Sequence, residues 1–316
     1  MTALATEYTT HRTAGRRTSL AVTVLAGGPG PEREVSLESG AAVYAALNRL
    51  GHCAVLRDIS PADLSALDEP ADFVFIALHG EFGEDGSLQA ELDRRGIRYS
   101  GCGAEASRLA MNKVAAKRRF EAGGVPTPRY VVAVDGSSAK EWDAVGVPAV
   151  VKPVSSGSSV DTSIVRDAAA LRGAVESVVR KYGEALVEQY IKGPELTVGI
   201  LGDTALPVCE IRTTREFYDY HAKYVDDTTQ YLFDLDLPVD LLKRVQDVGL
   251  AAHRSLGCRA FSRVDVMVDG ATMRPYVLEV NTIPGMTSHS LLPKGAARIG
   301  LGFDQLCQRM IDLSLA

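Results

Sequence analysis

Short apolar runs alternate with amphipathic stretches in the first third of the chain. The strand-like runs are residues 20–25 (LAVTVL), 54–58 and 72–78 (DFVFIAL). Residues 35–47 repeat their apolar side chains at helical spacing, and residues 104–122 are expected to form another helix. Strands that alternate with helices predict a sheet with helices packed on it, so this part of the chain is expected to be an α/β unit.

A second set of elements follows in the rest of the chain. Strands are expected at residues 130–134, 147–152, 185–190, 195–201 and 261–268, with a further run from residue 276. Helices are expected at residues 166–182, 238–256 and 302–313. Together with the first third, this order predicts an α/β (α+β) protein with more than one domain.

The last two strand-like runs are expected to pair as a hairpin, because an Asp-Gly turn signal separates them. Such a hairpin would set Asp265 beside Glu279. Asn281 would point to the same face as Glu279, because side chains alternate along a strand. Two carboxylates and an amide oxygen are hard ligands that suit Mg²⁺ carrying the phosphates of a nucleotide. By itself, the cluster is equally compatible with the polar face of an exposed sheet.

Other polar residues stand where strands end and Gly-rich turns begin. Glu32 lies in the turn GGPGPE, where its carboxylate could receive an ammonium group, although the spacing is not that of a dinucleotide fingerprint. His79 follows a buried strand, where α/β sheets place ligands, but a lone histidine is more often structural. Lys152 precedes the loop PVSSGSS, which could bind phosphate or be a plain surface loop. Gly285 lies where a backbone N–H could face a developing oxyanion.

Two more features bear on a nucleotide site. Glu188 lies on an expected strand, where its carboxylate could accept a hydrogen bond from the exocyclic amine of an adenine. Residues 216–231 carry many aromatic and charged side chains without regular periodicity. They are therefore expected to form a long ordered loop that acts as a lid.

Composition narrows the class of protein. A chain of 316 residues is longer than one compact core usually holds, so about two or three domains are expected. The formal net charge of −6 gives no electrostatic footprint for nucleic acid or an anionic membrane. No apolar run reaches the roughly 18 residues of a membrane span, and residues 1–18 are expected to be a loose extension without a signal peptide. The five cysteines are scattered, so free thiols in a reducing cytoplasm are expected.

From about residue 21 to its C-terminus, the chain resembles the D-alanine–D-alanine ligase family of ATP-grasp enzymes. The resemblance rests on ordered blocks at residues 32–36 (EREVS), 78–86 (LHGEFGEDG), 157–160 (GSSV), 218–224 (YDYHAKY), 263–267 (RVDVM) and 279–290 (EVNTIPGMTSHS). It implies a three-domain ATP-grasp fold with a Rossmann-like N-terminal (pre-ATP-grasp) domain. The expected boundaries are residues 1–18 for the extension, 19–104 for the N-terminal domain, 105–187 for the central domain and 188–316 for the C-terminal domain with the metal site and lid.

The resemblance implies which residues bind the nucleotide and its metal. The residues expected to bind ATP are Lys113, Lys152, Glu188, Tyr190, Glu195, Phe217 and Lys223. Two Mg²⁺ ions, or Mn²⁺ in their place, are expected to be held by Asp265, Glu279 and Asn281.

It also implies which residues bind the amino acids. Around the first D-alanine it places Glu32, Ser158 and Tyr224, with His79 nearby. The tetrahedral intermediate would be stabilised by Arg263 and the backbone of Gly285. The carboxylate of the second D-alanine would be seated by Ser290 and Leu291.

The activity implied by the resemblance is the ATP-dependent joining of two D-alanines through a D-alanyl phosphate, for peptidoglycan precursors. The resemblance implies a cytoplasmic homodimer that binds neither nucleic acid nor membrane. Tyr224 favours D-alanine over D-lactate as the second substrate. Two alternatives stay open: an ATP-grasp ligase that joins other amino acids, and a homologue that binds nucleotide with weakened catalysis. The second is motivated by Asp161, which departs from the family pattern, as do Ile164 and Gln189.

Overall fold

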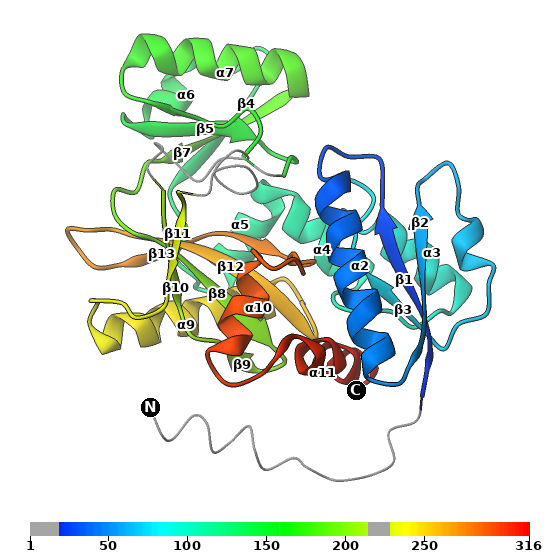
Figure 1. Ribbon diagram of the computed structural model, residues 1–316. Coiled ribbons are helices and arrows are strands. Elements are labelled where there is room, and N and C mark those ends of the chain that lie inside the picture. The colour runs from blue at the N-terminus through cyan, green and yellow to red at the C-terminus, as the bar shows by residue number, and fades with distance from the viewer. Residues whose placement is uncertain (1–18, 158, 214–227) are drawn as a thin grey trace.

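The computed structural model describes residues 19–157, 159–213 and 228–316, which form three β-sheets with helices packed against them (Figure 1). The mixed α/β class expected from the sequence is confirmed. Within these ranges, no helix combines the length and the apolar character needed to cross a membrane.

The first sheet is parallel and has the strand order β2–β1–β3, with β1 at Ala21–Gly27, β2 at Cys53–Ile59 and β3 at Phe73–Ile76. Helix α2 (Arg33–Arg49) packs on this sheet through buried side chains that include Val43 and Leu47. The same core takes in α11 (Phe303–Leu315), which Figure 1 shows beside α2. The last helix of the chain therefore completes the core of the first sheet.

Beyond β3, the chain continues through α3 (Ser87–Arg95) and then α4 (Ala104–Met111) and α5 (Lys113–Ala122). The single helix predicted for residues 104–122 is therefore wrong. Asn112 separates α4 from α5 because its backbone is extended and its side-chain oxygen accepts a hydrogen bond from the N–H of Ala115 at 2.9 Å. This break places Lys113 at the first position of α5.

The second sheet is antiparallel and has the order β4–β7–β5–β6. Its strands are β4 (Tyr130–Val134), β5 (Ala149–Pro153), β6 (Ser163–Val165) and β7 (Glu184–Gln189). Helix α7 (Ala168–Tyr182) covers one face, with the short α6 (Ala139–Asp143) beside β4 (Figure 1). Buried Leu171 and Val175 of α7 share a core with Val151 and Val187 of the sheet, which leaves the opposite face for the cleft described below.

The third sheet is antiparallel, with the order β11–β10–β8–β12–β13 and with β9 paired to β8. Its strands are β8 (Glu195–Leu201), β9 (Thr204–Ala205), β10 (Cys209–Arg212), β11 (Gln230–Leu232), β12 (Phe261–Val268) and β13 (Pro275–Asn281). Helix α9 (Val239–Ser255) packs on β8, β12 and β13, and α10 (Leu291–Ala297) packs on β8. The hairpin predicted from the Asp-Gly signal is confirmed as β12–β13.

The expected lid is only partly covered by the described residues. Residues 214–227 lie outside them, whereas Gln230 and Tyr231, which were predicted to belong to an irregular loop, pair with β10 as part of β11. The prediction is wrong at that end, because the backbone of β10 supplies hydrogen-bond partners that local sequence does not reveal. The domain boundaries at residues 104 and 187 stay predictions.

Candidate active site

Two adjoining cavities collect the predicted functional residues. The smaller, of about 110 Å³, is lined by residues that include Glu32, His79, Arg263, Asn281, Gly285, Ser290 and Leu291. The larger, of about 460 Å³, is lined by residues that include Lys152, Glu188, Tyr190, Glu195 and Asp265. Lys113, Ser156 and Glu279 line both. The cavities therefore meet at a lysine and a carboxylate, where a group held in one can reach a group held in the other.

Every predicted site residue within the described ranges lines one of these cavities. The predictions for Ser158, Phe217, Lys223 and Tyr224 fall outside those ranges. The larger cavity lies between the second and third sheets, since β5 and β7 line one side and β10, β12 and β13 the other. Residues far apart in the sequence thus converge because two sheets face each other.

The proposed metal ligands lie on the paired strands β12 and β13. Asp265 pairs with Glu279, as the hairpin predicted, and Arg263 pairs with Asn281. The register shifts just beyond Asp265. Such an irregularity re-aims side chains next to a site, and here Leu278 and Glu279 both line the larger cavity. Asp265 lines the larger cavity, Asn281 the smaller one and Glu279 both, so two carboxylates and an amide group lie where the cavities adjoin, and this donor set fits Mg²⁺.

The Asp265 carboxylate is held from three sides. Its Oδ1 accepts hydrogen bonds from the Thr197 hydroxyl at 2.7 Å and from Arg263 Nε at 3.0 Å. Its Oδ2 accepts from Arg263 Nη2 at 2.9 Å and from Asn281 Nδ2 at 3.2 Å. Among the described residues, no group of three or more His, Cys, Asp or Glu side chains is placed to hold a metal. A metal here would therefore depend on the amide oxygen of Asn281 and on oxygens of the bound substrate.

A buried ion-pair cluster lies at the back of the larger cavity. Glu188 is 2% exposed, and its two carboxylate oxygens lie 2.6 Å from Lys117 Nζ and 2.5 Å from Lys152 Nζ. Burial alone would raise the pKa of Glu188, but the two lysines outweigh it and hold that pKa at about 2. The carboxylate is therefore ionised and keeps Lys152 at the wall of the cleft.

This ion-pair cluster affects how the roles of Glu188 and Lys117 are interpreted. Both oxygens of Glu188 already face a lysine, so its predicted contact with the adenine amine stays a prediction. Lys117 was given no role from the sequence, yet it is fully buried and also donates to Thr127 Oγ1 at 2.6 Å. Its spacing of one helical turn from Lys113 was visible in the sequence, but only the fold shows that Glu188 lies opposite.

Lys113 lies where the two cavities meet. Its Nζ donates a hydrogen bond to the carbonyl oxygen of Ser156 at 2.5 Å, and its backbone N–H donates to the carbonyl of Val154 at 3.0 Å. The start of α5 is thus fastened to the Gly/Ser loop that follows Lys152. A lysine held over that loop can meet the phosphates of a nucleotide.

The smaller cavity contains carboxylates from two different turns. Glu32 stands at the N-terminus of α2 and is 8% exposed. A Cβ on Gly80 would lie 2.8 Å from Glu32 Oε2, so the turn after β3 can approach this carboxylate only as glycine, and its positive φ of +69° also favours glycine. The cavity is thus lined by a carboxylate and by the guanidinium of Arg263, which suits a zwitterionic amino acid.

Glu84 also lines this cavity, and no role was given to it from the sequence although it lies in the block LHGEFGEDG. Its Oε2 accepts a hydrogen bond from the N–H of Gly80 at 2.7 Å. Burial and the nearby Glu32 raise the pKa of Glu84 to about 8. At neutral pH this carboxyl group therefore holds a proton, which the sequence block alone does not indicate.

The turn that carries Gly285 is shaped by Ser290. The Ser290 hydroxyl accepts a hydrogen bond from the N–H of Thr287 at 2.9 Å. A Cβ on Gly285 would lie 2.6 Å from Ser290 Oγ, which is closer than real contacts allow. Gly285 is therefore needed for the tight packing of the loop at which the second substrate is expected.

The departures from the family pattern have different surroundings. Asp161 is bound by Lys181 and Tyr182 at the surface and lines neither cavity. Ile164 and Gln189 do line the larger cavity, and Gln189 Oε1 accepts a hydrogen bond from Arg129 Nε at 3.2 Å. The negative charge of Asp161 is thus paired with a lysine away from the cleft.

A lysine-lined cleft between two antiparallel sheets, next to a carboxylate-containing cavity, defines a ligase of the ATP-grasp class. Residues 54–102 match the family model described as D-ala D-ala ligase N-terminus, and residues 120–312 match the one described as D-ala D-ala ligase C-terminus. The chain belongs to the D-alanine–D-alanine ligase family, as the sequence resemblance implied.

Similar proteins span the same length. A D-alanine–D-alanine ligase of Gloeobacter violaceus is 47% identical over 300 residues, which cover 93% of this chain and 99% of the relative. A D-alanine–D-alanine ligase of Marinobacter nauticus is also 47% identical, over 93% of this chain and 91% of that protein.

Solved structures confirm the expected fold. The crystal structure of the Bacillus anthracis D-alanine–D-alanine ligase complexed with ATP superposes with a TM-score of 0.82 at 34% identity, and the match covers 94% of this chain and 98% of that one. The VanG D-Ala:D-Ser ligase of Enterococcus faecalis superposes with a TM-score of 0.83 at 28% identity and covers 94% and 100% of the two chains.

Proposed function

We propose that this protein joins two D-alanines at the expense of ATP, through a D-alanyl phosphate, to supply peptidoglycan precursors. The observation that carries the proposal is the junction of the two cavities at Lys113 and Glu279. The larger cavity suits a nucleotide, because lysines and carboxylates line it. The smaller cavity suits amino acids, because Glu32 and Arg263 present opposite charges to it.

The first step activates a carboxylate. The carboxylate of the first D-alanine attacks the γ-phosphoryl group of ATP, which gives D-alanyl phosphate and ADP. Lys113 and Lys152 compensate the charge of the phosphates, and Glu32 binds the ammonium of the first D-alanine. Bound Mg²⁺ would be held by Asp265, Glu279 and Asn281 and would neutralise charge on the phosphates.

The second step forms the peptide bond. The amine of the second D-alanine attacks the acyl carbon, and phosphate leaves. The oxyanion that develops is stabilised by Arg263 and the N–H of Gly285, and loss of one such donor typically costs roughly 10²–10³ in rate. Ser290 and Leu291 would seat the carboxylate of the second D-alanine. The acyl phosphate must be kept from water, which is the purpose we assign to the loop expected at residues 216–231.

We also infer that the protein acts in the cytoplasm and forms a homodimer. All five cysteines are free thiols, as expected in a reducing compartment. The homodimer rests on the family resemblance, as do the four predicted residues outside the described ranges.

The proposal is tested by coupled ADP release together with mass spectrometry of the products, with D-alanine, D-lactate and D-serine offered separately and in pairs. We expect D-alanyl-D-alanine from D-alanine. Turnover stimulated by D-lactate alone would contradict the dipeptide assignment, and a different mixed product would support a ligase for other amino acids.

A variant separates an active ligase from a nucleotide-binding homologue. Glu279→Gln is expected to abolish ADP formation while the fold, followed by circular dichroism, is kept. Glu91→Gln, a surface carboxylate outside both cavities, serves as the matched control and should retain activity. Undiminished turnover in Glu279→Gln would remove the metal role assigned to this carboxylate.

A further inference from the structure

Helix α2 carries two fully buried serines one turn apart, and they bind different parts of the molecule. Ser36 Oγ accepts a hydrogen bond from the N–H of Gly27 at 2.9 Å and donates to the carbonyl oxygen of Ala77 at 2.8 Å. Both partners belong to the first sheet or its ends, so Ser36 fastens α2 to its own unit.

Ser39 reaches across to the loop that follows β13. Its Oγ accepts a hydrogen bond from the N–H of Met286 at 3.2 Å and lies 3.4 Å from His79 Nε2. Ser39 lines neither cavity, so it does not contact a substrate held there. Met286 directly follows Gly285, whose backbone is the donor proposed for the oxyanion.

His79 is the second hydrogen-bond partner of Ser39. Burial lowers the pKa of His79, against smaller raising effects of Glu32 and of the backbone of Ile283, so the ring is neutral at pH 7. A neutral ring carries one proton, and with that proton on Nδ1 its Nε2 accepts a hydrogen bond from the Ser39 hydroxyl. The Ser39 oxygen then accepts the N–H of Met286 without conflict.

We propose that Ser39, supported by His79, is a positioning residue that clamps the Met286 end of the turn at residues 283–286 and so aims the N–H of Gly285 at the reacting carbonyl. The inference rests on the proposed function and goes beyond it by giving Ser39 a role in the second step. His79, expected to bind substrate, becomes part of the same clamp.

The clamp has a specific kinetic consequence. A displaced oxyanion donor slows attack of the amine, but it leaves formation of the acyl phosphate intact. The intermediate then has longer to react with water, so more ATP is consumed per dipeptide formed. Misplacement of a catalytic group by about 1 Å can cost 10²-fold in rate, so we expect Ser39→Ala to lower kcat for the dipeptide roughly 10- to 100-fold.

The test compares Ser39→Ala with Ser36→Ala in the full-length chain. Each variant removes one buried hydroxyl from the same helix, so both should unfold at a lower temperature. We expect only Ser39→Ala to raise the ratio of ADP released to dipeptide formed, with little change in the KM for ATP. Equal ratios in the two variants would overturn the proposal, because the loss would then be a general effect of destabilising α2.

Hydrogen exchange gives a second readout that does not depend on activity. The Met286 amide should exchange roughly 2- to 10-fold faster in Ser39→Ala than in the wild-type protein, as expected for loss of one hydrogen bond, and should be unchanged in Ser36→Ala. If the wild-type protein makes no dipeptide, the proposed function fails, whereas the clamp is judged by this exchange rate alone. Unchanged protection of Met286 in Ser39→Ala would show that the clamp is absent.

Discussion

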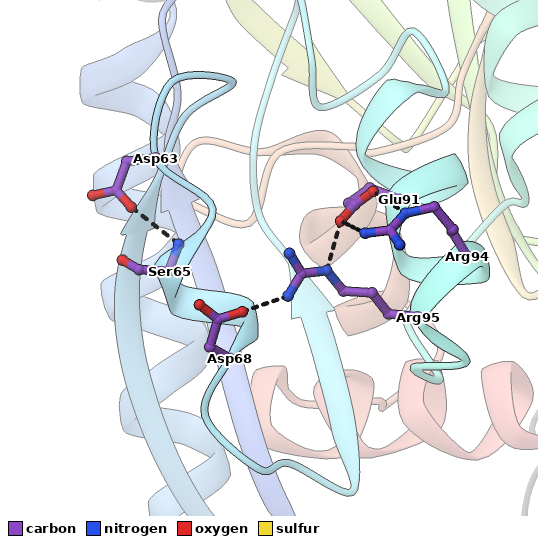
Figure 2. A network of polar contacts seen from close by, with 6 residues as sticks. All are labelled: Asp63, Ser65, Asp68, Glu91, Arg94 and Arg95. Atoms are coloured by element: carbon purple, nitrogen blue, oxygen red, sulfur yellow. Dashed lines mark hydrogen bonds and ion pairs between the residues drawn. The ribbon is translucent and has the colours of Figure 1, made fainter.

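Two carboxylates in this protein each lie between two cations, and they are held in very different surroundings. Glu188 is buried between Lys117 and Lys152 at the back of the larger cavity. Glu91, on α3 at the surface, bonds both Arg94 and Arg95 at 2.6 Å (Figure 2). Hydrogen bonds to the two arginines lower the pKa of Glu91 to about 2, the same value that Glu188 has. The two carboxylates therefore have equal pKa values, although Glu188 is buried and Glu91 is partly exposed.

The polar contacts drawn in Figure 2 link α3 to residues 63–68, a segment that lies close to α3. Arg95 also reaches Asp68 at 2.7 Å, and the nearby Asp63 accepts a hydrogen bond from the N–H of Ser65 beside the 3₁₀ turn η1 (Ser65–Leu67). Arg94 is 68% exposed, so water can replace its partner at small cost. In the buried cluster, Lys117 is fully buried and Glu188 is 2% exposed, so replacing a lost partner by water costs more. From this difference we expect that the burial of an ion pair, and not the pKa of its carboxylate, decides how much the pair contributes to the free energy of unfolding.

The largest effect is expected from Glu188→Gln. The substitution removes the charge that compensates two buried lysines, and breaking a buried pair typically costs about 3–5 kcal/mol. Chemical denaturation should show a loss of this size, together with weaker ATP binding because Lys152 is no longer held at the cleft. A loss as small as that of Glu91→Gln would show that water reaches the buried cluster and would remove the contrast.

A pH series on the same variant sharpens the comparison. The folded-state pKa of Glu188, about 2, lies below its ordinary value of 4.5. The stability that ionised Glu188 contributes is therefore complete above about pH 4.5 and is lost as the pH falls toward 2. The difference in free energy of unfolding between the wild-type protein and Glu188→Gln should shrink by roughly 3 kcal/mol across that window. A difference that stays constant with pH would contradict the assigned ionisation.

Lys152→Ala tests whether the lysine of the buried cluster that lines the larger cavity binds ATP. Glu188 keeps Lys117, so we expect a smaller loss of stability than in Glu188→Gln. The KM for ATP should rise roughly 10- to 100-fold, as expected for one lost hydrogen bond to a charged group. Steady-state kinetics with ATP varied would measure it, and Lys181→Ala, at the surface beside Asp161, is the matched control. An unchanged KM would leave Lys152 with a structural role only.

The smallest effect is expected from Glu91→Gln. Its partner Arg94 is 68% exposed and Arg95 is 23% exposed, so water can replace the lost contacts, and the melting temperature should change by no more than about 2 °C. The change should also diminish at high salt, since exposed charges are screened. A large and salt-independent loss would mean that this network is shielded from solvent and would make the two regions alike.

Local sequence determined most of the elements and the pairing of two candidate site residues. Short apolar runs predicted the strands of the first sheet, and the Asp-Gly signal predicted the β12–β13 hairpin that sets Asp265 beside Glu279. These predictions succeed because apolar runs and turn chemistry act over a few neighbouring residues. The short elements α6, β6, β9, β10, β11 and α10 were not predicted. Segments of a few residues carry too little periodicity and depend on their neighbours in space.

Tertiary structure alone decided which groups meet. Lys117 and Lys113 lie one helical turn apart, but only the packing of α5 near β7 turns one toward Glu188 and the other toward both cavities. Likewise, nothing near Ser39 in the sequence points to Met286, because the contact joins α2 to a loop at the other end of the chain. Burial and long-range contacts arise only when separate sheets come together, so the charge state of Glu84 and the partners of Ser39 could not be obtained from sequence by itself.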